Sequence, residues 1–431
     1  MFSIIIKQII NRRKSNFWLG LELLLVFCAV WFIVDYFFVL GCNLSKTSHR
    51  NTNNTYLMNI GILPETHAEY FTEEEQPENK TANFNRIVDR LQHHPDVETV
   101  GISFRRSYPG SDSFNNKPLQ NMEDSTVTIY PGILEIAATG DYLKTFRHLN
   151  KDGEGILSMR EVDLNDNKGV VITEMVEKKL FPGQSAVGKS VIPYRENPEE
   201  TYIVKAVVKD IKRDLNERVI PTIFKFQRID EGNVDNADVS IRLNKKLSSA
   251  ELASFKEDLF RDLRLGNYYL KDMVSYDKIM DDFDFSLGST TTIRVFVGLM
   301  IFFLLNVLLC VMGTFWYRVN SRREEIGIRR AMGATEEKIH YLFMAEGIFI
   351  LTLILIPAVL IEMQFVYADL IPTMGFSEDT KGLYLSDRWS VRLLITNSLT
   401  WMLLAAVMML SIWYPARRAG KITPIDALRD E

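Results

Sequence analysis

The chain has 431 residues, 47% of them hydrophobic, and a formal net charge of −5 at pH 7. Its basic residues cluster beside long apolar runs instead of covering one surface, so a nucleic-acid-binding role has no support. The three cysteines, Cys28, Cys42 and Cys310, are too few and too dispersed for a disulfide framework or a zinc site.

Four apolar runs are long enough to cross a bilayer as helices, which takes about 20 residues for a hydrocarbon core of about 30 Å. They cover residues 17–41, 293–317, 341–370 and 393–414. The third run is longer than a span needs and contains Pro357, so we expect a kink or a protruding end there. Residues 1–16 combine isoleucines at helical spacing with lysine and arginine, which predicts an amphipathic helix at the inner interface.

Lysine and arginine orient the spans, because they are enriched in cytoplasmic loops. They are abundant in residues 1–16, in the loop 318–340 and in the tail 415–431, whereas the loop 371–392 has only Lys381, Arg388 and, at its edge, Arg392. Both termini and the loop 318–340 are therefore predicted to be cytoplasmic. The large segment 42–287 is predicted to lie outside the cytoplasm.

The residues Val39–Cys42 faintly resemble a lipoprotein cleavage box. The apolar run before them is longer than that of a signal peptide and contains Glu22 and Asp35. These features favour an uncleaved membrane anchor over a cleaved and lipidated terminus.

The segment 42–287 has the pattern of a mixed α and β domain. An order of strand, helix and strand occurs twice, and the helix in the second unit has Ser248 or Ser249 as its N-cap. The predicted elements are 56–63, 83–93 and 97–104, then 238–243, 248–263 and 266–275. Between them we predict an inserted subdomain, at about residues 124–227, with strands at 125–137, 169–173 and 202–209. The polar runs 71–80 and 111–124 are expected to be exposed loops.

The segment Gly183–Ser190 matches the phosphate-binding loop pattern, with Gly183, Gly188, Lys189 and Ser190 at the defining positions. That pattern binds phosphate only where a strand precedes it and a helix follows, so that helix amides face the anion. Here a helix is predicted before it and a strand after it. We therefore interpret it as a helix-to-strand turn and predict no nucleotide site. His93 and His94 point in different directions at a helix end, so we predict no metal site there, and no catalytic residue is assigned.

The segment Ser321–Thr335, between the second and third spans, has the pattern of a short charged helix. Ile328 and Met332 lie four residues apart and share one face, and Glu325 and Arg329 have the favourable order for an ion pair. Gly333 is a natural C-terminal stop, and Thr335 is placed to cap the next helix. The simplest alternative is an ordinary basic loop that follows charge topology. The Gly333 stop and the Thr335 cap are two helix signals within a short loop, and they argue against this alternative.

Three segments carry a resemblance to a known family. Residues 323–334 resemble the signature of the MacB/FtsX/LolC superfamily of ABC transporter permeases, and the tail 414–429 resembles its closing motif. Residues 180–191 resemble a recurrent periplasmic turn of MacB-type permeases, which explains the apparent phosphate loop. The resemblance implies an α-helical membrane protein with four transmembrane helices and a large extracytoplasmic α+β domain, built from porter-like βαβ units with an inserted subdomain.

The resemblance also implies a function in the bacterial inner membrane. The chain would be a non-enzymatic permease subunit that transmits motion from a cytoplasmic ABC ATPase dimer to the periplasmic domain. It would pair with a second permease subunit, identical or paralogous, and would require ATP and Mg only through the ATPase. A periplasmic adaptor and an outer-membrane channel are further possible partners. The residues that match the ATPase-coupling segment are Arg323, Glu325, Ile326, Gly327, Arg329, Arg330, Gly333 and Ala334.

Polar side chains inside the spans must face protein or water, because a charge facing lipid is costly. We expect Glu22 and Glu346 near the cytoplasmic edge, and Asn306 and Glu362 in hydrogen bonds between helices or subunits.

Three functions remain open from the sequence. The first is export of a peptide, toxin, drug or lipoprotein. The second is an FtsX-like scaffold that activates a cell-wall hydrolase, and the third is a membrane sensor.

Overall fold

The computed structural model describes residues 13–75, 77–111, 115–124, 126–162, 168–193, 201–212, 219–368, 370 and 384–421. The chain divides into two compact units. We call Met1–Cys42 together with Thr291–Glu431 the membrane unit, and Asn43–Thr290 the sheet unit. Most of the predicted amphipathic N-terminal helix, most of the loop 371–392 and residues 422–431 of the tail lie outside the described residues.

The membrane unit contains four helices that are long and apolar enough to cross a membrane. They are α2 (Arg13–Ser45), α8 (Ser289–Ser321), α10 (Glu336–Tyr367) and α11 (Trp389–Gly420), the last preceded by a 3-10 turn at Ser386–Arg388. The short helix α9 (Arg323–Ala331) connects α8 to α10. Pro357 lies inside α10, which continues through it as one helix. Four spans predicted from hydropathy are therefore four helices in the structure.

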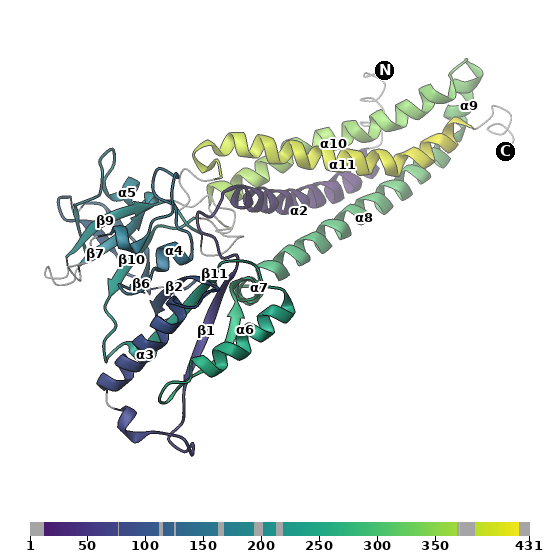
Figure 1. Cartoon of the computed structure of the whole chain (residues 1–431). Helices are drawn as coiled ribbons and strands as arrows, with labels where there is room; N and C mark the ends of the chain where they lie inside the picture. Colours follow the sequence, from purple (N-terminus) through teal and green to yellow (C-terminus); the bar gives the residue numbers. More distant parts are fainter. Residues whose placement is uncertain are drawn as a thin grey trace. The chain divides into compact units, whose positions relative to one another are not determined.

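Apolar side chains from all five helices form one core. α10 and α11 lie side by side (Figure 1) and carry much of it. Gly347 lies at a close contact between them, because a Cβ there would meet the side chains of Ile412 and Met408. α8 contributes Val307, Val311 and Phe315 to the core but exposes several large apolar side chains elsewhere, as expected of a helix in contact with lipid or a second subunit.

The sheet unit contains one continuous path of strands with an order far from the chain order. Across the sheet the strands are β12 (Tyr268–Ser275), β1 (Thr55–Ile62), β11 (Ala237–Leu243), β2 (Val97–Phe104), β6 (Gly132–Ala137), β10 (Thr222–Gln227), β7 (Gly169–Thr173), β9 (Tyr202–Val208), β8 (Ser190–Pro193), β4 (Leu119–Asn121) and β5 (Thr128–Ile129), with β3 (Asn115–Asn116) paired to β6.

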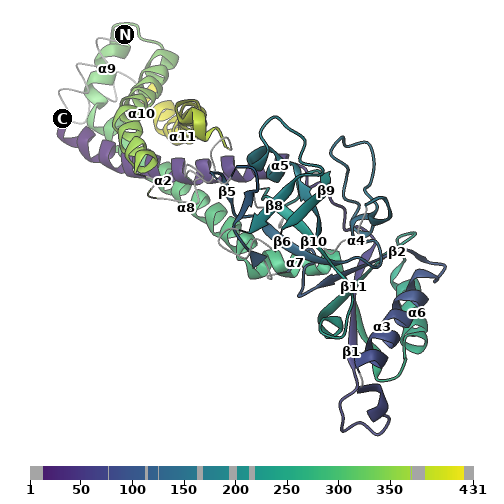
Figure 2. The ribbon, with the colours of Figure 1, turned by 90° about the vertical axis from the view of Figure 1, so that its left-hand side faces the viewer.

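The first four strands and two helices form a ferredoxin-like arrangement. β1, α3 (Pro77–Gln92) and β2 make one strand–helix–strand unit, and β11, α6 (Ser249–Asp262) and β12 make the other. β11 lies between β1 and β2 and is antiparallel to both, which gives two interlocked split βαβ units. Both helices pack on one face of this sheet (Figure 2), where their apolar stripes meet strand side chains. The two repeated units predicted from periodicity are confirmed.

The predicted cap of α6 is also confirmed. The Ser248 hydroxyl accepts from the Glu251 amide at 3.4 Å, and the Glu251 carboxylate accepts from the Ser248 amide at 2.8 Å. This reciprocal pair satisfies two amides that the first helical turn leaves open. It lowers the pKa of Glu251 to about 2, mainly through the Ser248 backbone.

The remaining strands form the second half of the sheet. It joins the first half through a single residue pair, Ser103 with Ile136. β6 and β10 pair in parallel, as do β7 and β9. Side chains of β4, β5, β7, β8, β9 and β10 enclose a separate apolar core with α5 (Glu174–Leu180). The thin junction explains why this half resembles an insertion.

Three details differ from the sequence prediction. The run 111–124 is not a loop throughout, because it contains β3 and β4, and β4, at Leu119–Asn121, pairs with β8 and β5. The strand predicted at 125–137 is two strands, β5 and β6, interrupted at Pro131, which has no amide to donate to a ladder. The run 71–80 is not a loop throughout, since it contains a 3-10 turn at Thr72–Glu75 and the start of α3.

Two short helices and two 3-10 turns also belong to the sheet unit. α4 (Tyr142–Thr145) and α7 (Tyr276–Ser286) pack on the face opposite α3 and α6, while the 3-10 turns Met159–Glu161 and Val234–Asn236 connect strands. α4 and α7 bring Tyr142 and Tyr276 together around Phe146. His148 is buried in the same cluster, 4.9 Å from the Phe224 ring between centroids.

His148 should make the sheet unit sensitive to acid. Neither ring nitrogen has a hydrogen-bond partner among the described residues, and burial lowers its pKa from 6.5 to about 3. In the unfolded chain the imidazole takes up a proton as the pH falls through about 6.5, whereas the folded one stays neutral. Stability contributed by the neutral form is therefore present above pH 6.5 and falls by up to ~1.4 kcal/mol per pH unit below it.

Replacing His148 with Phe should flatten this dependence between pH 7 and pH 5. The measurement is hydrogen–deuterium exchange of β10 peptides in the full chain, converted to free energies of opening at each pH. His93→Phe, at an exposed histidine, is the control and should leave the slope unchanged. Equal slopes in wild type and His148→Phe would contradict the assignment.

Candidate coupling site

The helix α9 has the local signals of a short independent helix. Glu324 and Glu325 lie in its first turn and Arg329 and Arg330 in its last, so both pairs complement the helix dipole. Gly333 has φ +90°, a left-handed conformation that favours glycine and ends the helix.

Thr335 begins α10 at once. Its hydroxyl accepts from the Lys338 amide at 3.3 Å, as expected of an N-cap. The chain therefore makes a sharp turn between two helices in four residues.

One face of α9 is held in the membrane unit. Ile326 and Gly327 are buried, and Ile326 belongs to the apolar core that α10 and α11 share. Arg330 lies at the turn, where its guanidinium donates to the Ala334 carbonyl at 3.4 Å and lies 3.6 Å from the Glu336 carboxylate. α9 therefore packs against the core that α10 and α11 share and contacts the start of α10.

The other face of α9 carries an exposed apolar pair. Ile328 is 55% exposed and Met332 is 75% exposed, and the two lie one helical turn apart. Of the residues predicted for coupling, Arg323 and Gly333 are exposed, while Glu325, Arg329, Arg330 and Ala334 are half-buried. Glu325 and Arg329 form the predicted ion pair, at 2.5 Å. Ile326 and Gly327 are buried inside the membrane unit, so the exposed part of α9 consists of the apolar pair and the charges around it.

A buried cluster of charge fixes the end of α8 against α10. The Glu346 side chain is 1% exposed and accepts from Arg318 at 2.7 Å and from Arg322 at 2.7 and 3.1 Å. We call these three residues the Arg–Glu cluster. Each guanidinium also lies over an aromatic ring, Arg318 over Phe315 at 5.1 Å and Arg322 over Phe343 at 5.8 Å. Arg322 is the residue directly before α9, so the cluster sets where α9 begins.

The sequence did not reveal this cluster. Glu346 was expected only near the edge of a span, and Arg318 and Arg322 were counted as loop charges. A signal was present, however, because Arg318 and Arg322 lie four apart and so share one face of a helix. A carboxylate on the next span was the missing partner.

The end of α11 completes the site. Gly420 lies so close to α10 that a Cβ there would be 3.1 Å from the Glu336 carbonyl oxygen. α11 also contacts α9. α8, α9, α10 and α11 therefore meet in one small region.

The other predicted polar residues have different environments. Glu22 is half-buried and accepts from the Cys310 thiol at 2.8 Å, which joins α2 to α8. Glu362 is buried and accepts from the Asn397 amide at 2.6 Å, which joins α10 to α11. Asn306 is exposed on α8 and forms no hydrogen bond within the described part of this chain.

A second charge pair was also missed. Arg392, counted by the sequence as a loop charge, is fully buried in α11 and forms a two-point ion pair with Asp35 of α2, at 2.9 and 2.5 Å. The Trp31 indole donates to Thr396 at 2.9 Å one turn away. These contacts join the first and last spans.

The phosphate-loop pattern lies at the turn between α5 and β8, as predicted. Gly183 and Gly188 have φ +73° and +84°, conformations that explain the glycines. Lys189 hydrogen-bonds Gln184 and lies 5.2 Å from the Phe181 ring, so its ammonium is engaged within the turn. Among the described residues, no group of three or more His, Cys, Asp or Glu side chains could hold a metal ion.

Comparison with known proteins shows what the chain is similar to. Residues 297–424, which include α9 and the Arg–Glu cluster, match the family model described as the FtsX-like permease C-terminal domain. The chain is also 26% identical over 295 residues to the uncharacterized ABC transporter permease YknZ of Bacillus subtilis strain 168, covering 66% of this chain and 68% of YknZ. The chain is therefore similar to FtsX-like permeases over residues 297–424 and to an ABC transporter permease over 295 residues.

Solved structures similar to this chain include the periplasmic region of MacB from Actinobacillus actinomycetemcomitans, at 14% identity and a TM-score of 0.31, over 54% of this chain and 94% of that one. The extracellular domain of YknZ from Gram-positive bacteria is similar at 14% identity and a TM-score of 0.29, over 51% of this chain and all of that one.

Replacing Glu346 with Gln should destabilise the membrane unit by about 3–5 kcal/mol, because it removes the carboxylate that two buried guanidinium groups share. The measurement is the thermal unfolding midpoint of the full chain in detergent. Glu324→Gln changes the exposed acid in the first turn of α9 and serves as the matched control, with an unchanged midpoint. If the two variants unfold at the same temperature, the cluster does not stabilise the unit.

Proposed function

We propose that the chain is a permease subunit that transmits ATP-driven motion from a cytoplasmic ATPase pair, through α9 and its spans, to the sheet unit on the other side of the membrane. The motion would drive export of a peptide, toxin, drug or lipoprotein. The observation that carries this proposal is the exposed apolar pair Ile328 and Met332 on a helix whose opposite face is fixed in the core. Exposed apolar side chains rimmed by charge are typical of a protein docking surface.

The direction of transmission follows from charge. Basic residues near the ends of the spans support a cytoplasmic position for α9 and both termini, and an extracytoplasmic position for the sheet unit. A cytoplasmic α9 would meet a soluble ATPase directly. The bacterial inner membrane is the location that fits this arrangement.

The permease would transmit motion and would not itself bind or hydrolyse ATP. ATP and Mg would be bound by the partner ATPase, because the phosphate-loop pattern of this chain is a helix-to-strand turn. A second permease subunit, identical or paralogous, would complete the membrane part. A periplasmic adaptor and an outer-membrane channel would extend the export path.

Rigid seating makes α9 suited to transmit force. The Arg–Glu cluster ties the residue before α9 to α10, and Arg330 ties its last turn to the start of α10. Displacement of α9 would therefore move the ends of α8 and α10 together. α8 follows α7 of the sheet unit in the chain, so its displacement would be delivered to that unit.

Replacing both Ile328 and Met332 with Glu should weaken association with the ATPase by roughly ten- to a hundred-fold, because the complex would lose two buried apolar side chains and gain two desolvated carboxylates. The measurement is the amount of ATPase that co-purifies with the full permease and its dissociation constant. Phe260→Glu changes an exposed apolar residue of α6 in the sheet unit and should leave association unchanged. Undiminished association of the double variant would overturn α9 as the docking element.

Replacing Arg329 and Arg330 with Glu tests transmission in a different way. The change places like charges at positions 325 and 329 and removes the Arg330 contacts to the turn. ATPase activity of the complex should fall several-fold. The variant Glu325→Arg with Arg329→Glu restores the ion pair in reverse order and should recover part of the activity. Unchanged association and unchanged turnover in the Arg329→Glu, Arg330→Glu variant would contradict the proposal.

A further inference from the structure

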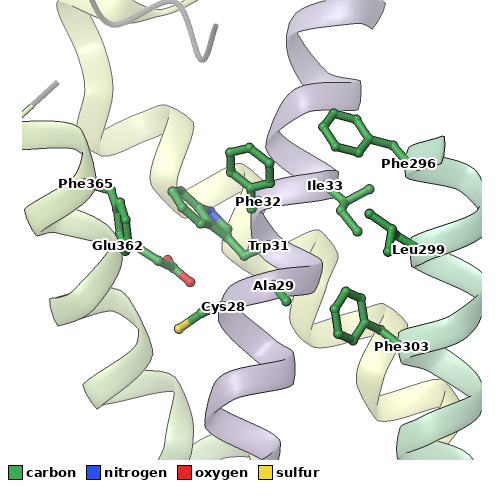
Figure 3. A pocket seen from close by; sticks show the side chains of 10 residues that line it. All are labelled: Cys28, Ala29, Trp31, Phe32, Ile33, Phe296, Leu299, Phe303, Glu362 and Phe365. Carbon is green, nitrogen blue, oxygen red and sulfur yellow. The ribbon is translucent and has the colours of Figure 1, made fainter. Parts of the chain in front are cut away.

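A pocket of ≈ 370 Å³ lies between α2, α8 and α10 inside the membrane unit (Figure 3). Aromatic side chains from all three helices line it: Trp31, Phe32, Phe296, Phe303 and Phe365. Ala29, Ile33, Leu299 and Cys28 complete the wall, and Glu362 is its one acidic group. A single carboxyl in an aromatic pocket is an unusual combination at membrane depth.

The Glu362 carboxyl is oriented toward this pocket. It extends from α10 toward α2, between Trp31 and Cys28 (Figure 3). Oε2 accepts from the Asn397 amide at 2.6 Å, while Oε1 is buried and has no hydrogen-bond partner among the described residues. A buried polar atom left without a partner costs about 1–3 kcal/mol, and more if charged. Its retention here points to a partner that the chain alone does not supply.

Arg392, a buried arginine of the same membrane unit, does not fill this role. It is held by Asp35 through two hydrogen bonds. Asn397 satisfies only one of the two oxygens of Glu362. Oε1 therefore has no partner among the described residues, on a side chain that lines the pocket.

We propose that this pocket binds a lipid-soluble organic ammonium, with its cationic nitrogen on Glu362 and its apolar body among the aromatic rings. Aromatic faces attract ammonium groups, the more strongly when both are desolvated, and a carboxylate adds the opposite charge. An acyl chain has no group for Oε1, and an anion would be repelled by it. The chemistry of the lining thus selects a hydrophobic cation.

The pocket is placed to receive such a ligand from one leaflet. Glu362 lies about 7 Å from the end of α10 at Tyr367 and about 39 Å from its start beside α9. The site is therefore in the half of the membrane opposite α9. The inference does not depend on the coupling role proposed for α9.

Photo-crosslinking tests the proposal directly. The full chain in lipid nanodiscs is treated with a diazirine-bearing dodecylammonium, whose N–H groups can donate to Oε1, or with the matching diazirine dodecanol, and the labelled peptides are mapped by mass spectrometry. The ammonium probe should label residues 28–33 and 296–303 in a saturable manner that unlabelled dodecylammonium competes away. The alcohol should label them weakly and without saturation.

Two variants separate charge from space. Glu362→Gln keeps an oxygen for Asn397 and should raise the concentration of ammonium probe needed for half-saturation about ten-fold. Ala29→Phe fills the pocket and should abolish saturable labelling while Glu362 is intact. Glu22→Gln changes the other acid of these spans, which does not line the pocket, and should behave as wild type.

Three results would overturn the proposal. Equal labelling by the alcohol, or no effect of Glu362→Gln, would mean that the pocket is a groove for any lipid tail. Absence of labelling together with disulfide cross-linking through Cys28 between two copies would mean that a second subunit covers it. Loss of ATPase docking in the α9 variants would leave all of these readouts unchanged, so the two proposals fail independently.

Discussion

The membrane unit depends on one buried interaction, the carboxylate of Glu346 between the guanidinium groups of Arg318 and Arg322. Charges removed from water are tolerated only when their partners are close and well oriented. This requirement fixes the end of α8 against α10. The two helices are connected by the nine residues of α9, followed by a glycine turn. The position of α9 is thus a consequence of electrostatics in the spans on either side of it, not only of its own sequence.

A second buried ion pair also holds two spans together. Asp35 and Arg392 join α2 to α11, so that the first and last spans are tied by charge while apolar packing fills the unit between them. α8 is the exception. Its bonds to the other spans lie at Glu22 and in the Arg–Glu cluster, and much of its apolar surface is exposed. It is also the span that follows the sheet unit directly in the chain.

The sequence predicted the elements whose signals are local. Apolar length located the four spans, periodicity located β1, α3, β2 and their repeat, and Gly333 with Thr335 located the break between α9 and α10. The sequence failed where an element depends on a distant partner. The strand at Leu119–Asn121 has a polar, loop-like composition and exists only because β8 and β5 pair with it.

The same reason explains the missed site residues. Arg318, Arg322 and Arg392 look like ordinary topogenic charges in a linear sequence, because nothing within a few residues distinguishes a buried arginine from one in a loop. Their role follows from carboxylates on other helices. The faces of α9 were likewise only half predicted, since Ile328 and Met332 were recognised as a pair, but the burial of Ile326 depends on the core beneath it.

α10 carries both Glu346, which seats α9, and Glu362, which faces the aromatic pocket about 24 Å further along the helix axis. A ligand on Glu362 and a motor on α9 would therefore act on the same rigid element. By thermodynamic linkage, a ligand that changes the affinity of α9 for the ATPase through α10 has its own affinity changed by ATPase binding to the same extent. If an ammonium in the pocket favours one placement of α10, ATPase binding must favour or oppose the ligand by the same factor. Two sites with unrelated chemistry are in this way joined by one helix, which at Gly347 packs so closely against α11 that a Cβ would meet Ile412.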